Sequence, residues 1–385
     1  MPGFELIGKE EYKEIQDLFE NSGILFRHGF DAMRNDIYKV RDFEKKFSKK
    51  LGVADSLAVS SGTAALKVAL EAIGVGKGDE VITQAFTFVA TVESIVEAGA
   101  KPVIANIDKT LNINPQDLEA KITNKTKAII VVHMLGIPSD MSSVMKIAKK
   151  HNLKVIEDTA WGCGGKYDDQ YLGTIGDLGT FSFDFAKTIT TGEGGMVIAK
   201  DPLILEAAKA YHDHGHENNP SLPRWEDSRS RSGFNYRMTE MQGAVGLAQL
   251  EKLDEIIASH QRNKETIIQK IKELPISFRS KPMSFKDTSD ALIFYVKDKA
   301  TALKCRENLL NRGISTKILP EAYTWHFAAT WKHIPELYSN WDEFESSLEP
   351  SKEIISRAVS LPISITLNPE NVNFIFKSIQ DACSK

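Results

Sequence analysis

Short apolar runs alternate with amphipathic stretches between residues 56 and 200, and this alternation restricts the possible folds more than any other feature of the chain. The run "SLAVS" precedes a stretch, 62–74, whose apolar residues Leu66, Ala69, Leu70 and Ile73 recur at the spacing of one helix face. Further strand-like runs are "DEVITQ", "KPVIANID", "TKAIIVVHM" and "LKVIEDTA", separated by helical stretches. This order predicts an α/β fold with a mainly parallel sheet that helices cover on both faces.

The pattern changes near residue 239. Helical periodicity then continues as far as Pro275, as is common for a helix that bridges two domains. Strand candidates follow at 291–298 and 314–319, with a helix between them that Gly313 closes and a last helix that Asn368 and Pro369 open. We therefore expect a large domain over residues 1–245 and a small C-terminal α/β domain over 246–385. The polar segment 212–235 has the length and composition of a functional or mobile loop.

Charge and composition exclude several classes of protein. The 385 residues include 48 basic and 52 acidic side chains, a net charge of −4, so the balance indicates neither a nucleic-acid nor a membrane-surface protein. No apolar run reaches the length of a membrane span, and no secretory signal is visible, so we expect a cytoplasmic protein. The widely spaced Cys163, Cys305 and Cys383 indicate neither a metal site nor a disulfide framework.

Two features of the first domain suggest a site for an anionic ligand at the ends of the strands. Gly62 and Thr63 open a helix directly after a strand, where backbone N–H groups and the helix dipole favour phosphate. A Gly-Thr pair at such a position is more often only a cap. Asp158 follows an apolar strand at the edge where open α/β sheets bind ligands, although alone it is more typical of a turn.

Two further features fit the same ligand. Phe88 has a flat ring that can stack on another, although aromatic residues in such runs are usually core. Lys187 lies between a strand and a glycine-rich corner, with Ser182 five residues earlier; alone it would be an exposed loop lysine. Pyridoxal 5′-phosphate requires all four features: an amine for a Schiff base, a carboxylate opposite the pyridine nitrogen, an aromatic face and a phosphate seat. The amine must be partly desolvated so that its neutral form can attack.

The segments "SSGTAAL", "EDTA", "GDLGTFSFDFAKTITTGEGGMV" and "NYRMTEMQGAVGLAQLEKLD" together resemble the DegT/DnrJ/EryC1/StrS family of sugar aminotransferases, and the resemblance runs from about residue 5 to the C-terminus. It implies the pyridoxal-phosphate-dependent transferase fold type I, that of aspartate aminotransferase. It also implies that Lys187 forms the Schiff base, that Asp158 pairs with the pyridine nitrogen and that Phe88 stacks on the ring. The phosphate ligands that it implies are Gly62, Thr63, Ser182 and, from the neighbouring subunit of a homodimer with shared active sites, Asn235.

One position departs from the family pattern. The family usually has Gln or His three residues after the aspartate, near the ring hydroxyl, and this chain has Trp161 there. Two interpretations remain open. Either Trp161 covers the ring edge with its N–H, or another group serves the hydroxyl.

Three segments resemble one branch of the family, which aminates the C8 aldehyde of an oxidised 3-deoxy-D-manno-octulosonate for lipopolysaccharide synthesis. They are "LFRHGFDAMRND", "HDHGHEN" and "YTWHFAATWKH". The product of that branch is 8-amino-3,8-dideoxy-D-manno-octulosonate. Its substrate is a free acidic sugar, so the site would need cations for the carboxylate. The candidates for substrate binding, each of which could equally be an ordinary surface charge, are Arg27, Arg34, His214 and His326.

The expected reaction is ping-pong transamination with L-glutamate as amine donor, in which Lys187 moves the proton. The alternative acceptor is a nucleotide-linked 3- or 4-keto-6-deoxy sugar. A sugar dehydratase of the same family would have histidine in place of Lys187. A binding protein without turnover is disfavoured by the complete set of Lys187, Asp158 and the segment 193–195. A dinucleotide-binding fold is disfavoured because no G-x-G-x-x-G follows a strand.

Overall fold

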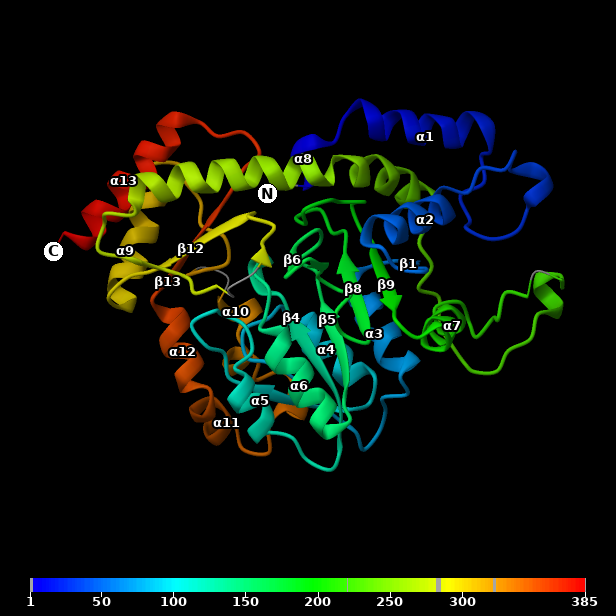
Figure 1. Ribbon diagram of the computed structural model, residues 1–385, viewed down its shortest axis with the longest axis horizontal. Coiled ribbons are helices and arrows are strands. Elements are labelled where there is room, and N and C mark those ends of the chain that lie inside the picture. The colour runs from blue at the N-terminus through cyan, green and yellow to red at the C-terminus, as the bar shows by residue number, and fades with distance from the viewer. Residues whose placement is uncertain (1–2, 220, 282–284, 321–322, 385) are drawn as a thin grey trace.

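A seven-stranded sheet forms the centre of the molecule (Figure 1). The computed structural model describes residues 3–219, 221–281, 285–320 and 323–384. The strand order is β1-β9-β8-β5-β4-β2-β3, and the neighbours from β8 to β3 pair in parallel, whereas β9 is antiparallel to both β8 and β1. The prediction of an α/β fold with a mainly parallel sheet is confirmed.

The strands of this sheet are β1 (Leu57–Val59), β2 (Glu80–Gln84), β3 (Lys101–Ala105), β4 (Thr126–Val132), β5 (Lys154–Asp158), β8 (Leu178–Ser182) and β9 (Gly195–Ala199). The helices around them are α1 (Lys9–Asn21), α2 (Lys39–Leu51), α3 (Gly62–Ala72), α4 (Ala90–Glu97), α5 (Pro115–Ala120), α6 (Met141–His151), α7 (Pro202–Tyr211) and α8 (Glu240–Ile271).

Helices cover the sheet on both faces, as its apolar strands require. Along β4, Ala128 and Ile130 pack in the cluster that contains α3 and α7, whereas Ile129 and Val131 pack in the cluster that contains α5 and α6. On the second face, α2 and α8 cover β8 and β9 through Phe181 and its neighbours. The carboxyl ends of the parallel strands therefore remain the edge at which side chains can meet a ligand.

Helix α8 runs across both parts of the chain (Figure 1). It begins with a capping box, in which Thr239 Oγ1 accepts from the backbone N–H of Gln242 and the Gln242 side chain accepts from the N–H of Thr239. Its first half packs against α1 and α2, and its 32 residues end at Ile271, four before Pro275. The division of the chain at 245/246 remains a prediction, and that position lies inside α8.

The C-terminal part contains a smaller antiparallel sheet of β10 (Ser277–Phe278), β12 (Ala291–Tyr295) and β13 (Ala358–Pro362). Helices α9 (Lys299–Leu310) and α13 (Pro369–Cys383) pack on it. The prediction for α13 is confirmed, because Asn368 accepts a hydrogen bond from the N–H of Glu370 and Pro369 is the first helical residue. Shorter helices are α10 (Tyr323–His326), α11 (Trp341–Ser347) and α12 (Glu349–Ser356). A third sheet joins β6 (Lys166–Tyr167) and β7 (Gln170–Tyr171) to β11 (Phe285–Lys286).

The predicted strand at 314–319 is wrong. The segment forms only two backbone hydrogen bonds with β13, from Lys317 N to the Ser360 carbonyl and from Ser360 N to the Leu319 carbonyl. Ile318 has a φ of 70°, a left-handed conformation that a β-branched residue rarely adopts and that ends an extended run. The strand that pairs with β12 is instead β13, forty residues later.

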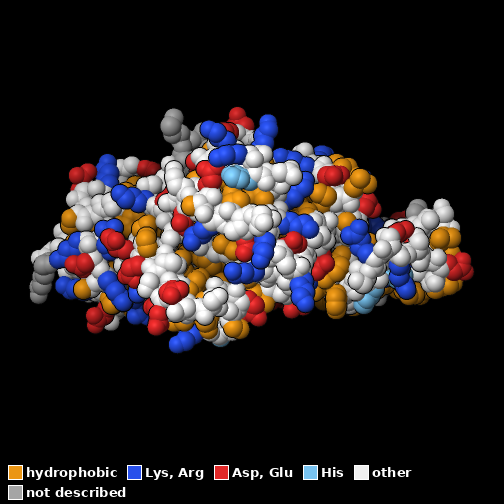
Figure 2. Space-filling view, turned by 90° about the horizontal axis from the view of Figure 1, so that it is seen from below, with side chains coloured by type: hydrophobic (Ala, Val, Ile, Leu, Met, Phe, Trp, Pro, Cys, Tyr) orange, Lys and Arg blue, Asp and Glu red, His pale blue; other side chains and the backbone are white. Residues whose placement is uncertain are grey.

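The segment 212–235 projects from one end of the molecule (Figures 1 and 2). Only a single turn of 3-10 helix, Arg224–Glu226, interrupts it among its described residues, and residue 220 lies outside them. Figure 2 shows basic and acidic side chains interspersed over one face of the molecule, in keeping with the nearly balanced charge. Within the described residues, we find no helix that is both long and apolar enough to cross a membrane.

Candidate active site

Asp158 ends β5 in the middle of the sheet and is 5% exposed. Its Oδ2 accepts a hydrogen bond from Thr91 Oγ1 at 2.9 Å, and its Oδ1 accepts one from the backbone N–H of Ala160 at 3.2 Å. Burial raises the pKa of Asp158, and the two hydrogen bonds and the charge of Lys187 oppose this only in part. The groups of the protein itself therefore stabilise the ionised form of Asp158 only in part.

Lys187 lies in the turn between β8 and β9, as the glycine-rich corner suggests. The residue is partly exposed, but neighbouring groups enclose its amine, and this desolvation lowers the pKa of Lys187 to about 8. The carboxylates of Asp184 and Asp158 oppose the shift, whereas the positive charge of Lys317 adds to it. An amine with this pKa is partly neutral near physiological pH, as a nucleophile must be.

The structure brings the start of α3 against the end of β8. A Cβ on Gly62 would lie 2.6 Å from the Cβ of Ser182, so only glycine allows this approach. Thr63 is the next, exposed residue, and Ser61 caps the helix by accepting from the N–H of Ala64 at 3.0 Å. A Cβ on Gly195 would lie 2.3 Å from the Ser61 carbonyl oxygen, which explains the glycine corner after Lys187. The result is one cradle of hydroxyls and helix N–H groups.

Phe88 precedes α4 and is 37% exposed, so it is not the core residue that its apolar run suggests. Its ring centroid lies 5.4 Å from that of His326 and 6.3 Å from that of Trp325. Backbone hydrogen bonds from Thr87 N to the His326 carbonyl and from Val89 N to the Trp325 carbonyl fix this arrangement. His326, a predicted substrate ligand, thus lies beside the predicted stacking residue.

Trp161 covers the amine of Lys187. The Nζ atom lies 3.8 Å from the centroid of the indole ring, a distance at which an ammonium is attracted to the aromatic face. The carbonyl oxygen of Trp161 accepts a hydrogen bond from Thr288 in the C-terminal part. The departure from the family pattern therefore lies directly at the predicted cofactor lysine.

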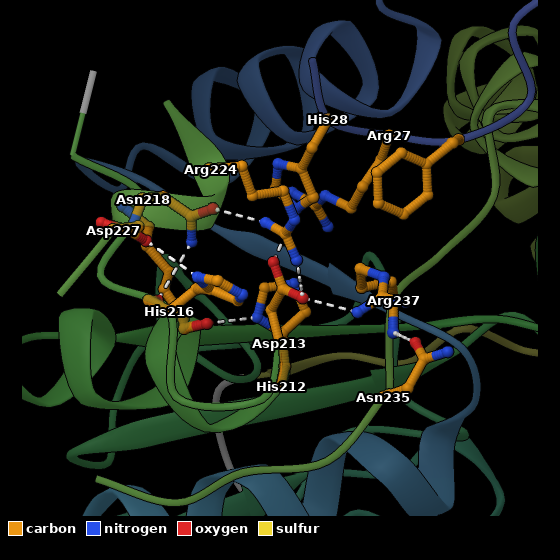
Figure 3. A network of polar contacts seen from close by, with 12 residues as sticks. Arg27, His28, His212, Asp213, His216, Asn218, Arg224, Asp227, Asn235 and Arg237 are labelled. Carbon is orange, nitrogen blue, oxygen red and sulfur yellow. Dashed lines mark hydrogen bonds and ion pairs between the residues drawn. The ribbon is translucent and has the colours of Figure 1, made fainter. Parts of the chain in front are cut away.

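Asn235 is exposed and lies beside a buried cluster centred on Asp213 (Figure 3). Asp213 Oδ1 accepts from Arg224 at 2.6 Å and from Arg237 at 2.5 Å. His28 Nε2 lies 3.2 Å from Asp213 Oδ2, although the two atoms do not form a hydrogen bond. Burial would raise the pKa of Asp213, but the hydrogen bond from Arg224 and the neighbouring charges more than offset it and hold this pKa below its ordinary value.

Arg27 and Arg34 both form hydrogen bonds and ion pairs with other residues of the chain. Arg27 donates to Glu44 and to the Ala58 carbonyl, both at 2.8 Å. Arg34 is fully buried, pairs with Glu240 at 3.4 Å and donates to three backbone carbonyls. These contacts argue against either guanidinium as the ligand of a substrate carboxylate, because each would have to leave a buried partner. His214 is exposed, next to Asp213.

Two residues that support the site are missing from the sequence-based prediction. Thr91 supplies the hydroxyl that holds Asp158, and Lys317 faces Trp161 from the C-terminal part. Thr91 follows Phe88 by one helical turn, which is a weak signal for a shared location. Lys317 carries no signal, because only the tertiary fold places it near Lys187.

Comparison with known proteins places this geometry in a family. The model of the DegT/DnrJ/EryC1/StrS aminotransferase family matches residues 31–380. The chain belongs to this family. The predictions of a sugar aminotransferase, of fold type I and of pyridoxal 5′-phosphate as cofactor are confirmed.

Three relatives illustrate the similarity. GDP-perosamine synthase of Escherichia coli O157:H7 is 36% identical over 346 residues, which cover 89% of each chain. The spore coat polysaccharide biosynthesis protein SpsC of Bacillus subtilis strain 168 is 32% identical, over 98% of this chain and 95% of its own. The crystal structure of an aminotransferase from Psychrobacter cryohalolentis superposes with a TM-score of 0.85 at 27% identity, over 98% of this chain and 97% of its own. None of these names points to the octulosonate branch.

The residues of the site fit pyridoxal phosphate. Asp158 is a buried carboxylate whose pKa is raised, Lys187 is an amine whose pKa is lowered, and the close approach of Gly62 to Ser182 brings a hydroxyl beside the N-terminus of α3. When bound, the cofactor supplies an electrophilic carbon and an electron-withdrawing ring. Asp158 would hold a proton at the pyridine nitrogen, and Lys187 Nζ would move a proton at the substrate carbon.

Proposed function

We propose that this protein transfers an amino group from L-glutamate to the keto group of a nucleotide-linked 3- or 4-keto-6-deoxy sugar. The observation that carries the proposal is the similarity, over 89% of each chain, to GDP-perosamine synthase, whose name denotes a nucleotide-linked amino sugar, together with the placement of Lys187 and Asp158.

Each residue predicted to hold the cofactor has a role in this proposal. Lys187 holds the cofactor covalently and moves the proton, and Asp158 holds the pyridine proton. Phe88 stacks on the ring from the side of His326. Trp161 excludes water at the amine. The phosphate ligands are Gly62, Thr63, Ser182 and, from a second subunit, Asn235.

The test is a panel of acceptors with L-glutamate as donor, in which released 2-oxoglutarate is measured. The panel contains GDP-, UDP- and dTDP-linked 4-keto-6-deoxy sugars, a 3-keto isomer, and the C8 aldehyde of oxidised 3-deoxy-D-manno-octulosonate. We expect kcat/KM for one nucleotide-linked sugar to exceed that for the octulosonate at least about tenfold, because recognition of a second ligand moiety adds binding energy. The variant Lys187→Ala is the blank. Higher kcat/KM with the octulosonate would contradict the proposal.

A second candidate acceptor is the octulosonate aldehyde. It is supported by the fold, since two of the three segments that resemble that branch meet in space: His28 from the first lies beside Asp213 from the second. Arginines surround that cluster, but Arg224 and Arg237 pair with Asp213 and Arg27 pairs with Glu44, which weakens the case for an acidic sugar there. Of the four predicted substrate ligands, His214 is exposed and His326 lies beside Phe88.

A homodimer with shared sites is part of the proposal. Asn235 is exposed at the base of the projecting segment, and its Oδ1 accepts from the N–H of Arg237, so the amide nitrogen is the group that would donate to a phosphate. Exposed apolar side chains lie near it in the sequence, including Phe234 at 58% and Met241 at 39% exposure. A two-fold contact over this surface would bring each Asn235 to the phosphate seat of the other subunit.

A further inference from the structure

A buried lysine, Lys317, faces the ring that covers the amine of Lys187. Lys317 lies after α9 in the C-terminal part, whereas Trp161 follows β5 of the central sheet. Lys317 Nζ lies 4.9 Å from the centroid of the Trp161 ring, and Lys187 Nζ lies 3.8 Å from it. Both distances fall within the range in which an ammonium interacts with an aromatic face. One indole ring therefore receives an ammonium from each part of the chain.

Asp290 fixes the position of Lys317. Lys317 Nζ donates to Asp290 Oδ2 at 2.5 Å and to the Asp290 carbonyl oxygen at 3.2 Å, and the two side chains are 5% and 1% exposed. Two residues earlier, Thr288 Oγ1 donates to the carbonyl oxygen of Trp161 at 3.1 Å. The turn before β12 thus holds the lysine that faces the ring and also the backbone that carries the ring.

The charges around Lys187 come from both parts of the chain. Asp184 and Asp158 favour its ammonium form, as does Asp290, whereas burial and Lys317 disfavour it. His260 on α8 is fully buried near the Lys317–Asp290 pair, and this burial lowers the pKa of His260. Because Lys317 and Asp290 act on Lys187 with opposite signs, removing one should have the opposite effect to removing the other.

We propose that Lys317 and Asp290 are positioning residues for the catalytic lysine, which hold Trp161 over the Lys187 amine and set the charge that this amine experiences. The inference rests on the proposed role of Lys187 as the lysine that binds the cofactor. It adds a role for the C-terminal part of the chain, whose residues influence the Lys187 nitrogen through their charge and through Trp161 and do not contact that nitrogen directly.

The variants are Lys317→Met, Asp290→Asn, the double variant and the conservative Lys317→Arg. Lys46→Met, which removes an exposed lysine on α2, is the matched control. The first readout is the pH midpoint at which Lys187 in the cofactor-free full chain reacts with trace acetic anhydride, followed on its own peptide by mass spectrometry. The second is the pH titration of the visible absorbance and circular dichroism of the cofactor-loaded protein.

We expect the Lys187 midpoint to rise by about one pH unit in Lys317→Met and to fall by about half a unit or more in Asp290→Asn, because a neighbouring charge is removed in each. Lys317→Arg should stay near the wild type. The double variant leaves no unpaired charge and should fold. Its midpoint should lie between those of the single variants, with weaker visible circular dichroism per bound cofactor, because the ring is no longer held.

The inference is overturned if Lys317→Met and Lys317→Arg titrate alike, or if both single variants shift in one direction, as a purely structural loss would produce. These results can be distinguished from failure of the proposed function. If borohydride reduction maps the cofactor to another lysine, the proposed function fails, whereas the acetic anhydride midpoint still reports whether Lys317 acts on Lys187.

Discussion

Two buried aspartates show how differently this protein treats charge. Asp213 accepts from two arginines and lies beside a histidine, and its pKa is held low. Asp158 is offered a threonine hydroxyl and one backbone N–H, and burial raises its pKa. Two arginines therefore balance the charge of Asp213 through its Oδ1 atom, whereas Asp158 forms no ion pair within the described residues. This difference separates a carboxylate that stabilises the fold from one that is suited to hold the proton of a ligand.

Removing Lys187 should have the largest effect on this comparison. In Lys187→Ala we expect no covalent cofactor, no yellow colour and a loss of transamination of about a thousandfold or more, because no other amine faces Trp161 from the same turn. Absorbance and borohydride labelling with peptide mapping measure the outcome. Lys200→Ala, which removes an exposed lysine after β9, is the control. Labelling at a lysine other than Lys187 in the wild type would contradict the assignment.

Neutralising Asp158 should have the second largest effect. We expect Asp158→Asn to fold and to bind cofactor but to lose activity about a hundredfold, because asparagine fills the same space yet cannot hold the pyridine proton. Far-ultraviolet circular dichroism and steady-state turnover test this expectation. Near-normal turnover would mean that Asp158 is only a turn residue, and the contrast with Asp213 would lose its functional meaning.

The same substitution at Asp213 should act on stability instead. Asp213→Asn leaves Arg224 and Arg237 without a counter-charge, so we expect the free energy of unfolding to fall by about 3 kcal/mol. Chemical denaturation measures the loss. Asp254→Asn, which breaks only the exposed pair with Lys50, should cost less than about 1 kcal/mol. Equal costs at the two positions would remove the distinction drawn here.

Acid should weaken the Asp213 cluster before it affects the sheet. Burial lowers the pKa of His28 to about 2 and that of His212 to about 3, so both remain neutral in the folded chain. Below about pH 6.5 the unfolded chain binds protons that the folded chain does not, so stability falls with falling pH until the folded histidines titrate. We expect a loss of about 2 kcal/mol between pH 7 and pH 5.5. His212→Gln should reduce this slope, and an unchanged slope would contradict the assignment.

The smallest effect concerns shared sites. Mixing Lys187→Ala chains with chains that carry a bulky residue at Asn235 should restore about half of the wild-type activity in each mixed dimer, since one site then receives both defects and the other neither. The measurement is activity after unfolding and refolding the mixture. Separately refolded parents give the baseline. Mixed dimers without recovered activity would show that Asn235 does not serve a neighbouring subunit.

Much of the fold follows from local pattern. The apolar runs gave the parallel strands because each is buried on both faces, and Asn368 with Pro369 marked α13 because capping is a local interaction. The wrong strand prediction at 314–319 also has a local cause, the left-handed conformation of Ile318. No residue type in this run predicts that conformation. The order of the strands, with β9 reversed next to β1, depends on long-range pairing.

The site divides in the same way. Lys187, Asp158 and Gly62 are recognisable because each follows a strand at the same edge of the sheet. The partners that tune them are not, since Thr91, Lys317 and Asp290 come from separate elements and meet only in the tertiary structure. Arg27 and Arg34 show the opposite case, in which local chemistry suggested more than the fold supports. Guanidinium chemistry suggested substrate binding, whereas burial gave both side chains protein partners.

The length and stiffness of helix α8 have a mechanical consequence for the proposed homodimer. Thr239 caps this helix four residues after Asn235, and His260 further along lies buried near the pair of Lys317 and Asp290. Its 32 residues contain no proline, so it is a stiff rod of about 48 Å. In the proposed homodimer, we expect a tilt of the C-terminal end of α8 to displace the segment that presents Asn235, because the two lie at opposite ends of one rigid helix.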